Sequence, residues 1–172
     1  MLFRSRGKFD FIVLICPTYV HSKTFFCIGE KDPHMFPVLC EQHKVEEELA
    51  FFSDFFKGTN TLIILDDWAA SKEVKGRTSS LVELAFSGRH KGISVWVLTQ
   101  KNTRITVLFR ENTAAVVLFY TPSSKTTKAI FEDYAGEMPL GEYRHWIAKL
   151  KQQKFSYLVF LLQWPFGVRY CG

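Results

Sequence analysis

The sequence has few of the residues on which disulfide-rich, disordered or fibrous chains depend. Its 172 residues include 10 Gly, 6 Pro and 4 Cys. The cysteines, at positions 16, 27, 40 and 171, form no CxxC pair and are widely spaced, which favours a reducing compartment over a disulfide scaffold. With 47% hydrophobic residues and 17 Phe, the composition excludes a disordered or collagenous chain.

Long hydrophobic runs are also absent. No uninterrupted apolar stretch approaches the ~18 to 20 residues that cross a bilayer, so we expect no membrane span. A basic N-terminus followed by an apolar run resembles a signal peptide, but Asp10 interrupts that pattern and Pro17 ends it. The 22 Lys+Arg and 17 Asp+Glu leave a net charge of +5, which permits contact with nucleic acid without demonstrating it.

Five apolar runs of strand length alternate with helical or loop-like segments, the order expected of an α/β protein with a mainly parallel sheet. The first run is apolar at every position, which is typical of a strand covered on both faces. The predicted strands are residues 11–16, 61–65, 93–98, 114–120 and 157–162.

Helical periodicity is present between these runs. Apolar residues at steps of four, three and four over residues 45–56 predict a helix that Gly58 ends. Ser80 and Glu83 have the spacing of a capping box for a short helix that Gly88 can end. Two later helices are predicted from apolar residues at 129, 130 and 134, and at 143, 146, 147 and 150.

Polar residues follow the predicted strands, and ligands of α/β sheets bind beyond the carboxyl ends of strands. Asp66 and Asp67 directly follow the second strand. One carboxylate there can hold Mg²⁺ while the other orients or deprotonates an attacking water, the logic of a Walker B motif. Two carboxylates that only cap the following loop are an equally open interpretation.

Gln100 ends the third strand, where a side-chain amide could contact a γ-phosphate and the attacking water. A simple turn residue is the alternative. Arg89 lies before this strand and could act in trans as an arginine finger, with Arg104 and Arg110 as rivals. Each of these arginines could equally make an ordinary surface or inter-strand contact.

Two other groups contain residue types that commonly form binding sites. Lys72, Lys75 and Arg77 form a basic loop that could contact nucleic-acid phosphates, or could simply be solvated. A second group has the residue types of zinc ligands, but its spacings of seven, six and three match no known finger, so we expect no metal there; its members are Cys27, His34, Cys40 and His43.

Three segments together carry a family resemblance. They are FIVLICPTY from Phe11, LIILDDWAASKEVKGRTSSLVELAFSGRHKGISVWVLTQ from Leu62, and FRENTAAVVLFYTPSSKTTKAIFEDYAGE from Phe109. These segments resemble the poxvirus-type genome-packaging ATPases of the FtsK/HerA superfamily. The resemblance implies a RecA-like P-loop NTPase core of the ASCE class, which assembles as a ring, hydrolyses ATP with Mg²⁺ and drives double-stranded DNA into a capsid.

The resemblance also implies roles for single residues. Asp66 would be the Mg²⁺ ligand of Walker B, Asp67 the catalytic acidic residue, and Gln100 the polar sensor, while Arg89 would match the family's arginine. The implied partners are double-stranded DNA, a homo-oligomeric ring or complete ATPase subunits, and capsid or portal components. The implied location is an intracellular site of virus assembly, in the cytoplasm or nucleus.

One motif of the family is missing from the sequence. Such ATPases use a G-x-x-x-x-G-K-[ST] loop to hold phosphates, and the only Gly-Lys pair near the start, Gly7-Lys8, is followed by Phe9. The resemblance places this Walker A strand and loop before the segment that starts at Phe11, with the strand between the sensor strand and the last strand. We therefore expect a single, partial P-loop domain over residues 1–172 that is inactive alone.

Two alternatives to a partial motor ATPase remain open at this point. The chain could be a noncatalytic module that associates with complete ATPase subunits or with DNA. It could also be a Mg²⁺ nuclease, since two-metal enzymes use clustered carboxylates. A nuclease ranks last, because Glu30, Asp32 and Glu83 are not aligned with a third ligand position.

Overall fold

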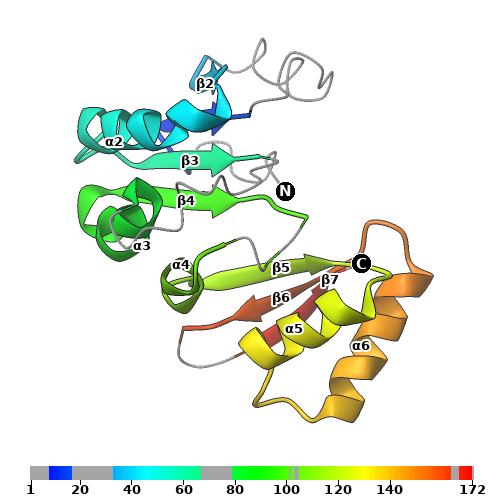
Figure 1. Cartoon of the computed structure of the whole chain (residues 1–172). Helices are drawn as coiled ribbons and strands as arrows, with labels where there is room; N and C mark the ends of the chain where they lie inside the picture. The colour runs from blue at the N-terminus through cyan, green and yellow to red at the C-terminus, as the bar shows by residue number, and fades with distance from the viewer. Residues whose placement is uncertain are drawn as a thin grey trace. The chain divides into compact units, whose positions relative to one another are not determined.

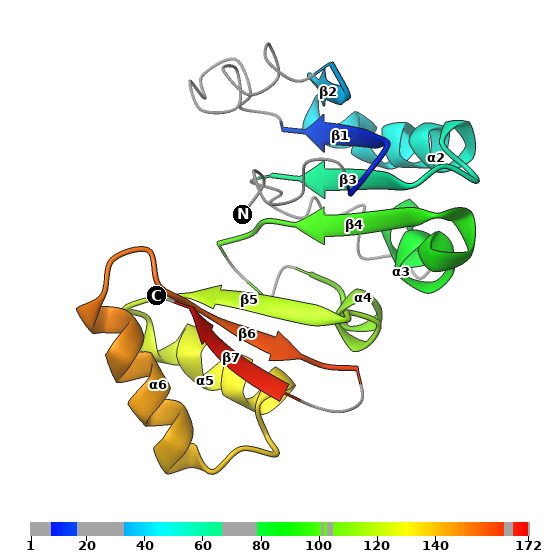
Figure 2. The same cartoon turned by 180° about the vertical axis from the view of Figure 1, so that it is seen from behind.

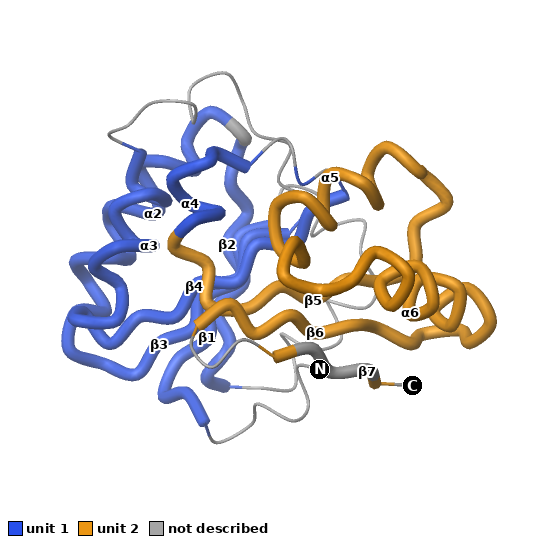
Figure 3. Tube along the Cα trace, turned by 90° about the horizontal axis from the view of Figure 1, so that it is seen from below, with its two compact units in different colours: residues 1–111 blue, residues 112–172 orange. Residues whose placement is uncertain are grey.

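The structure, a computed structural model, describes residues 8–16, 33–66, 79–100, 102, 105–163 and 167–171. It forms two compact units, residues 1–111 and 112–172 (Figure 3). Each unit has its own sheet. The expectation of one domain over the whole chain stays a prediction. Within the described residues, no helix has both the length and the apolar character needed to cross a membrane.

The sheet of unit 1 has four parallel strands in the order β2-β1-β3-β4 (Figures 1 and 2). The strands are β1 (Phe11–Ile15), β2 (Met35–Val38), β3 (Thr61–Leu65) and β4 (Ile93–Val97). All five residues of β3 are buried, because this apolar strand is paired on both sides and covered on both faces. The predicted parallel α/β sheet is confirmed.

Helices α2 (Val45–Phe55) and α3 (Ser80–Lys91) cover one face of this sheet (Figure 1). Two short helical segments, η3 (Gln42–Lys44) and α4 (Val107–Glu111), complete the unit. The predicted stripe of α2 is confirmed, since Val45, Leu49 and Phe56 are buried in one cluster with strand residues such as Ile63. Alternate strand residues form a second cluster on the other face, consisting of Ile12, Leu14, Cys16, Met35, Leu62 and Ile64.

Both predicted ends of α3 are wrong. The N-cap is Ser79, whose hydroxyl accepts a hydrogen bond from Val82 N at 3.4 Å, and Glu83 pairs with Lys91 instead of closing a capping box. The helix continues through Gly88 to Gly92, which has a φ of 77° and so ends it in the left-handed region. Gly88 serves close packing, since a Cβ there would lie 2.8 Å from the carbonyl oxygen of Ile93.

Strand β2 was missed because it contains Pro37, which demotes an apolar run as a strand candidate. Its place at the edge of the sheet explains why proline is tolerated, since an edge strand needs hydrogen bonds on one side only. The sequence also missed β7, which lies at the edge of the second sheet.

The sheet of unit 2 is antiparallel, with β6 (Tyr157–Leu161) between β5 (Ala115–Phe119) and β7 (Gly167–Cys171). Helices α5 (Ser124–Tyr134) and α6 (Leu140–Gln152) pack on one face of it (Figure 2). The predicted stripe of α6 is confirmed, since Tyr143 and Leu150 are buried and Trp146 and Ile147 pack against the same core.

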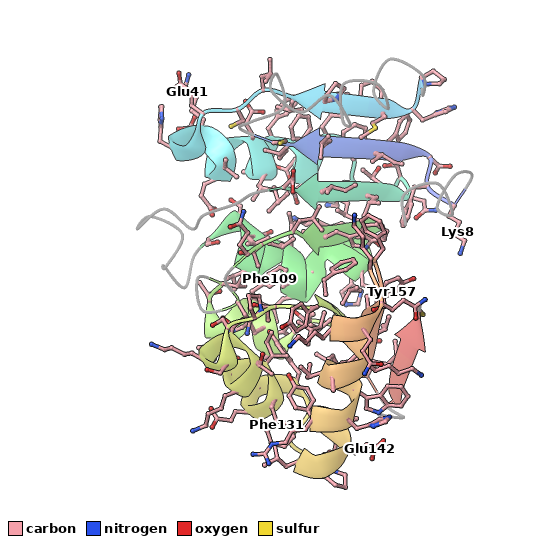
Figure 4. The ribbon with its side chains drawn as sticks, turned by 90° about the vertical axis from the view of Figure 1, so that its right-hand side faces the viewer. Lys8, Glu41, Phe109, Phe131, Glu142 and Tyr157 are labelled. Atoms are coloured by element: carbon pink, nitrogen blue, oxygen red, sulfur yellow. The ribbon has the colours of Figure 1, made fainter. Side chains whose placement is uncertain are left out.

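Tyr143 ties α6 to α5. Its hydroxyl donates to the Thr127 carbonyl at 2.9 Å, and its ring centroid lies 4.9 Å from that of Phe131. Figure 4 labels Phe131 on α5. Burial raises the pKa of Tyr143 to about 12, so the hydroxyl remains a donor at neutral pH.

Candidate functional site

The four parallel strands of unit 1 end at one edge of the sheet, and Asp66 lies there directly after β3 (Figure 1). Backbone pairing continues past the strands at this edge. Asp66 N donates to Ile15 O at 3.0 Å, and Leu98 N donates to Leu65 O at 2.8 Å. Both bonds are made by the peptide group that joins Leu65 to Asp66, and they fix it to the chain after β4 and to β1. The Asp66 side chain therefore starts from a rigid position.

The Asp66 carboxylate is half-buried and lies beside Cys16, the residue that follows β1. The buried Cys16 thiol donates to Asp66 Oδ2 across 3.6 Å. A thiol is a weak donor, and this contact orients the carboxylate through Oδ2. Sequence reasoning missed Cys16, although the parallel pairing of the first two predicted strands would have placed it next to Asp66.

Gln100 is exposed and follows β4 at the same edge of the sheet as Asp66. The register pairs Leu65 with Val97, so Asp66 and Gln100 come one and three residues after paired positions. The structure therefore brings the predicted metal ligand and the predicted sensor to one edge.

Arg89 lies at the other end of the strands of this sheet, near their amino ends. It is exposed in the last turn of α3, and the end of this helix is fixed to the amino end of β3 because Thr61 N donates to Gly92 O at 3.1 Å. Since β4 has five residues, at about 3.3 Å each, Arg89 is separated from Asp66 by roughly the length of a strand. Arg89 could therefore contact a site at Asp66 only if that site belonged to another copy of the chain.

Glu46, in the first turn of α2, is a residue of this edge that the sequence did not reveal. Its carboxylate accepts hydrogen bonds from Ser79 Oγ at 3.1 Å and from Ser80 N at 2.6 Å. It thereby places a negative charge at the N-terminus of α3, where the helix dipole favours it. Glu46 thus fixes the position of Ser79 and Ser80, the first described residues after Asp66.

The remaining predicted site residues lie in that segment. Asp67, Lys72, Lys75 and Arg77 are all outside the described residues, so their roles stay predictions.

The group with zinc-ligand residue types is not assembled among the described residues, where no three His, Cys, Asp or Glu side chains form a metal-binding cluster. Cys27 lies outside the described residues. Cys40 donates its thiol hydrogen to Glu41 O at 3.2 Å. Burial, followed by the charge of Glu48, raises the pKa of this thiol, which disfavours the thiolate that binds metal.

The oriented carboxylate at the carboxyl ends of the strands, that of Asp66, suits Mg²⁺ better than it suits a metal ion whose ligands all come from the protein. Mg²⁺ prefers oxygen ligands, keeps several waters and is commonly bound by one or two carboxylates together with substrate phosphates. Asp66 supplies one oriented carboxylate of this kind. This arrangement can position a metal–phosphate complex, but it cannot by itself enclose a metal ion.

Solved structures with the same fold exist, although no family model and no curated protein sequence matches the chain. The genome-packaging NTPase B204 of Sulfolobus turreted icosahedral virus 2, in complex with ATP-gammaS, is 15% identical with a TM-score of 0.69, over 99% of this chain and 85% of B204. B204 of Sulfolobus turreted icosahedral virus, the DNA-packaging ATPase of that virus, is 14% identical with a TM-score of 0.57. That match covers 95% of this chain and 97% of the viral protein. The expected α/β fold of packaging ATPases is therefore confirmed.

The role of Glu46 can be tested by substitution. We expect Glu46→Ala to lower the free energy of unfolding by about 1 to 2 kcal/mol, because Ser80 N loses a charge-assisted hydrogen bond. Glu47→Ala is the matched control, since Glu47 is exposed in the same turn, and should change it by less than about 0.5 kcal/mol. Urea unfolding monitored by circular dichroism measures both; equal effects of the two substitutions would refute the role of Glu46.

Proposed function

We propose that this chain is the Walker B and sensor part of a Mg²⁺-dependent ATPase that moves double-stranded DNA into a virion. The observation that carries the proposal is the position of Asp66, which follows the buried central strand of a parallel sheet and shares its edge with Gln100. The likeness of the fold to a packaging NTPase bound to an ATP analogue supports the same proposal.

In this proposal Asp66 would hold Mg²⁺, which would supply positive charge to the phosphates of a bound ATP, and Asp67 would orient or deprotonate the attacking water. Gln100 contacts the γ-phosphate side of the site. Arg89 reaches the nucleotide of a neighbouring subunit, which its position at the opposite edge requires. Such an arginine would stabilise the negative charge that develops on the transferred phosphoryl group.

We further propose that the phosphate-binding loop comes from a strand–loop–helix segment that is not among the 172 residues. The strand pairing of β4 supports this. Among the described strands β4 pairs with β3 alone, and its last four residues are only half-buried although three of them are apolar. The opposite edge strand, β2, carries Pro37, whose backbone has no N–H to offer, whereas β4 has no such block to strand addition.

Without that loop the chain should neither bind ATP tightly nor hydrolyse it. A noncatalytic role as a module within rings of complete ATPase subunits is the second candidate, favoured by the absence of a G-x-x-x-x-G-K-[ST] motif from the sequence. Both candidates predict association with DNA and with ATPase subunits, and both allow contact with capsid or portal components. They differ in whether Asp66 holds a metal.

The metal role of Asp66 can be tested without ATP. Mn²⁺ prefers the same carboxylate and water ligands as Mg²⁺, and it broadens the NMR signals of nearby nuclei. We expect Mn²⁺ to broaden the amide signals of Cys16, Asp66 and Leu98 first, and Asp66→Asn to weaken this binding at least tenfold, or about 1.4 kcal/mol. Asp54→Asn, which removes an exposed acid of α2, is the control. Broadening that survives Asp66→Asn would refute the metal role.

The proposed DNA contact is made by Lys72, Lys75 and Arg77. Each phosphate neutralised by such a residue releases counterions and steepens the salt dependence of binding. Replacing all three by Gln should therefore flatten the slope of log K against log salt by about 2 to 3, measured by fluorescence anisotropy on duplex DNA. Replacing Lys125 and Lys128 on α5 by Gln is a control of similar charge change. An unchanged slope in the triple variant would remove this loop from the DNA contact.

A further inference from the structure

Phe155, in the turn between α6 and β6, is exposed at a conformational cost. Its side chain is 81% exposed, and its φ of 65° lies in the left-handed region that disfavours bulky residues. Its ring is contacted by the Lys154 ammonium, 5.1 Å from the ring centroid. The Phe155 ring is not part of the core cluster of unit 2. Backbone strain of this kind clusters at binding and switch sites.

A second exposed aromatic surface lies on α2 in unit 1. Glu47, Phe51, Asp54 and Phe55 have the spacing i, i+4, i+7 and i+8, so they share one face of the helix, and all four are exposed. We name this face the α2 outer stripe. Its two rings stack with centroids 5.7 Å apart and are 58% and 67% exposed.

The two rings of the α2 outer stripe contact the core only at its margin. Each lies against the ring of the next residue in the chain, Phe52 or Phe56, and more than half of each outer ring remains exposed. The core of unit 1 takes the opposite face, through residues such as Leu49 and Phe56. Asp54 lies in the last turn, where the helix dipole disfavours an acid, and that turn has no basic residue. A stacked aromatic pair with two acids on the same helix face is therefore maintained on the surface, and grouped exposed apolar side chains are a feature of interaction sites.

The surroundings of Phe155 have the opposite charge. Lys151 and Lys154 are both exposed, and both lie within four residues of Phe155. The two surfaces are thus complementary in kind: one has a single protruding ring with two ammonium groups, and the other has a stacked aromatic pair with two carboxylates. Aromatic anchors surrounded by charge are typical of the energetic centres of interfaces, and opposite charges fix the register of such contacts.

We infer that the Phe155 turn of one copy docks on the α2 outer stripe of a second copy. The two surfaces differ, so the contact is heterologous: each copy offers one surface to one neighbour and the other surface to the next. Such a contact propagates head to tail and closes into a ring or extends as a filament. It supplies the contact surface for the oligomer of the proposed function, but it does not depend on nucleotide or metal.

Complementation between two variants tests this inference. Phe155→Asp and Phe55→Asp each remove one of the two surfaces, so each variant alone should be monomeric in sedimentation velocity at about 100 µM, with self-association weakened at least tenfold. An equimolar mixture keeps one intact contact, between the α2 outer stripe of Phe155→Asp and the Phe155 turn of Phe55→Asp. It should therefore form 1:1 dimers and nothing larger, whereas the unaltered chain should form larger assemblies.

Controls separate the contact from misfolding. Phe86→Asp places the same charge at an exposed ring of α3 that belongs to neither surface, and should assemble as the unaltered chain does. The pair Lys154→Glu and Asp54→Lys should likewise associate better when mixed than alone. Far-UV circular dichroism checks that every variant is folded.

Three results would each overturn the inference: an unaltered chain that is monomeric, variants that assemble normally, or a mixture that stays monomeric. Because no ATP or metal is present, such a result leaves the metal role of Asp66 to its own test.

Discussion

Strand β3 is hydrogen-bonded to β1 on one side and to β4 on the other, and none of its residues is more than 1% exposed. Burying an aliphatic side chain stabilises a fold by about 1.5 to 3 kcal/mol. The four positions after Thr61, which are Leu62–Leu65, therefore cannot hold a carboxylate. The chain can place a carboxylate only where the strand leaves the core, and Asp66 is that position. Through pairing with β1 and β4, the same strand also places Cys16 and Gln100 at that edge.

The direction of the helices then separates the functional groups of unit 1. Helix α3 runs back along the sheet, so its N-terminus meets Glu46 at the carboxyl edge while Arg89 lies at the amino edge. The proposed metal ligand, Asp66, and the proposed arginine finger, Arg89, lie at opposite ends of the strands. In the proposal they therefore cannot serve one nucleotide within one chain. The proposed ATPase would therefore complete its site by assembly, and the inferred contact between the Phe155 turn and the α2 outer stripe would bring the copies together.

Much of the fold follows from apolar patterning, because the buried strands and the inward faces of α2 and α6 leave little choice of residue. Local choices were harder to predict. The sequence did not distinguish Ser79 from Ser80 as the cap of α3, because adjacent serines satisfy the same pattern. It assigned the end of the helix to Gly88, a glycine that serves close packing instead, because pattern alone does not distinguish the reasons for a glycine. Asp66 and Gln100 were predictable as strand ends, whereas Glu46 acts through a contact distant in sequence.

The central claim is that this chain holds the metal and water side of an ATP site and lacks its phosphate loop. The most direct test joins the chain to a preceding strand–loop–helix segment that carries G-x-x-x-x-G-K-[ST], and measures Mg²⁺-dependent ATP hydrolysis beside the 172-residue chain. We predict turnover only in the joined protein, and a loss of about 10²- to 10⁴-fold when its Asp67 is replaced by Asn. Turnover by the 172-residue chain alone, abolished by Asp67→Asn, would contradict the claim.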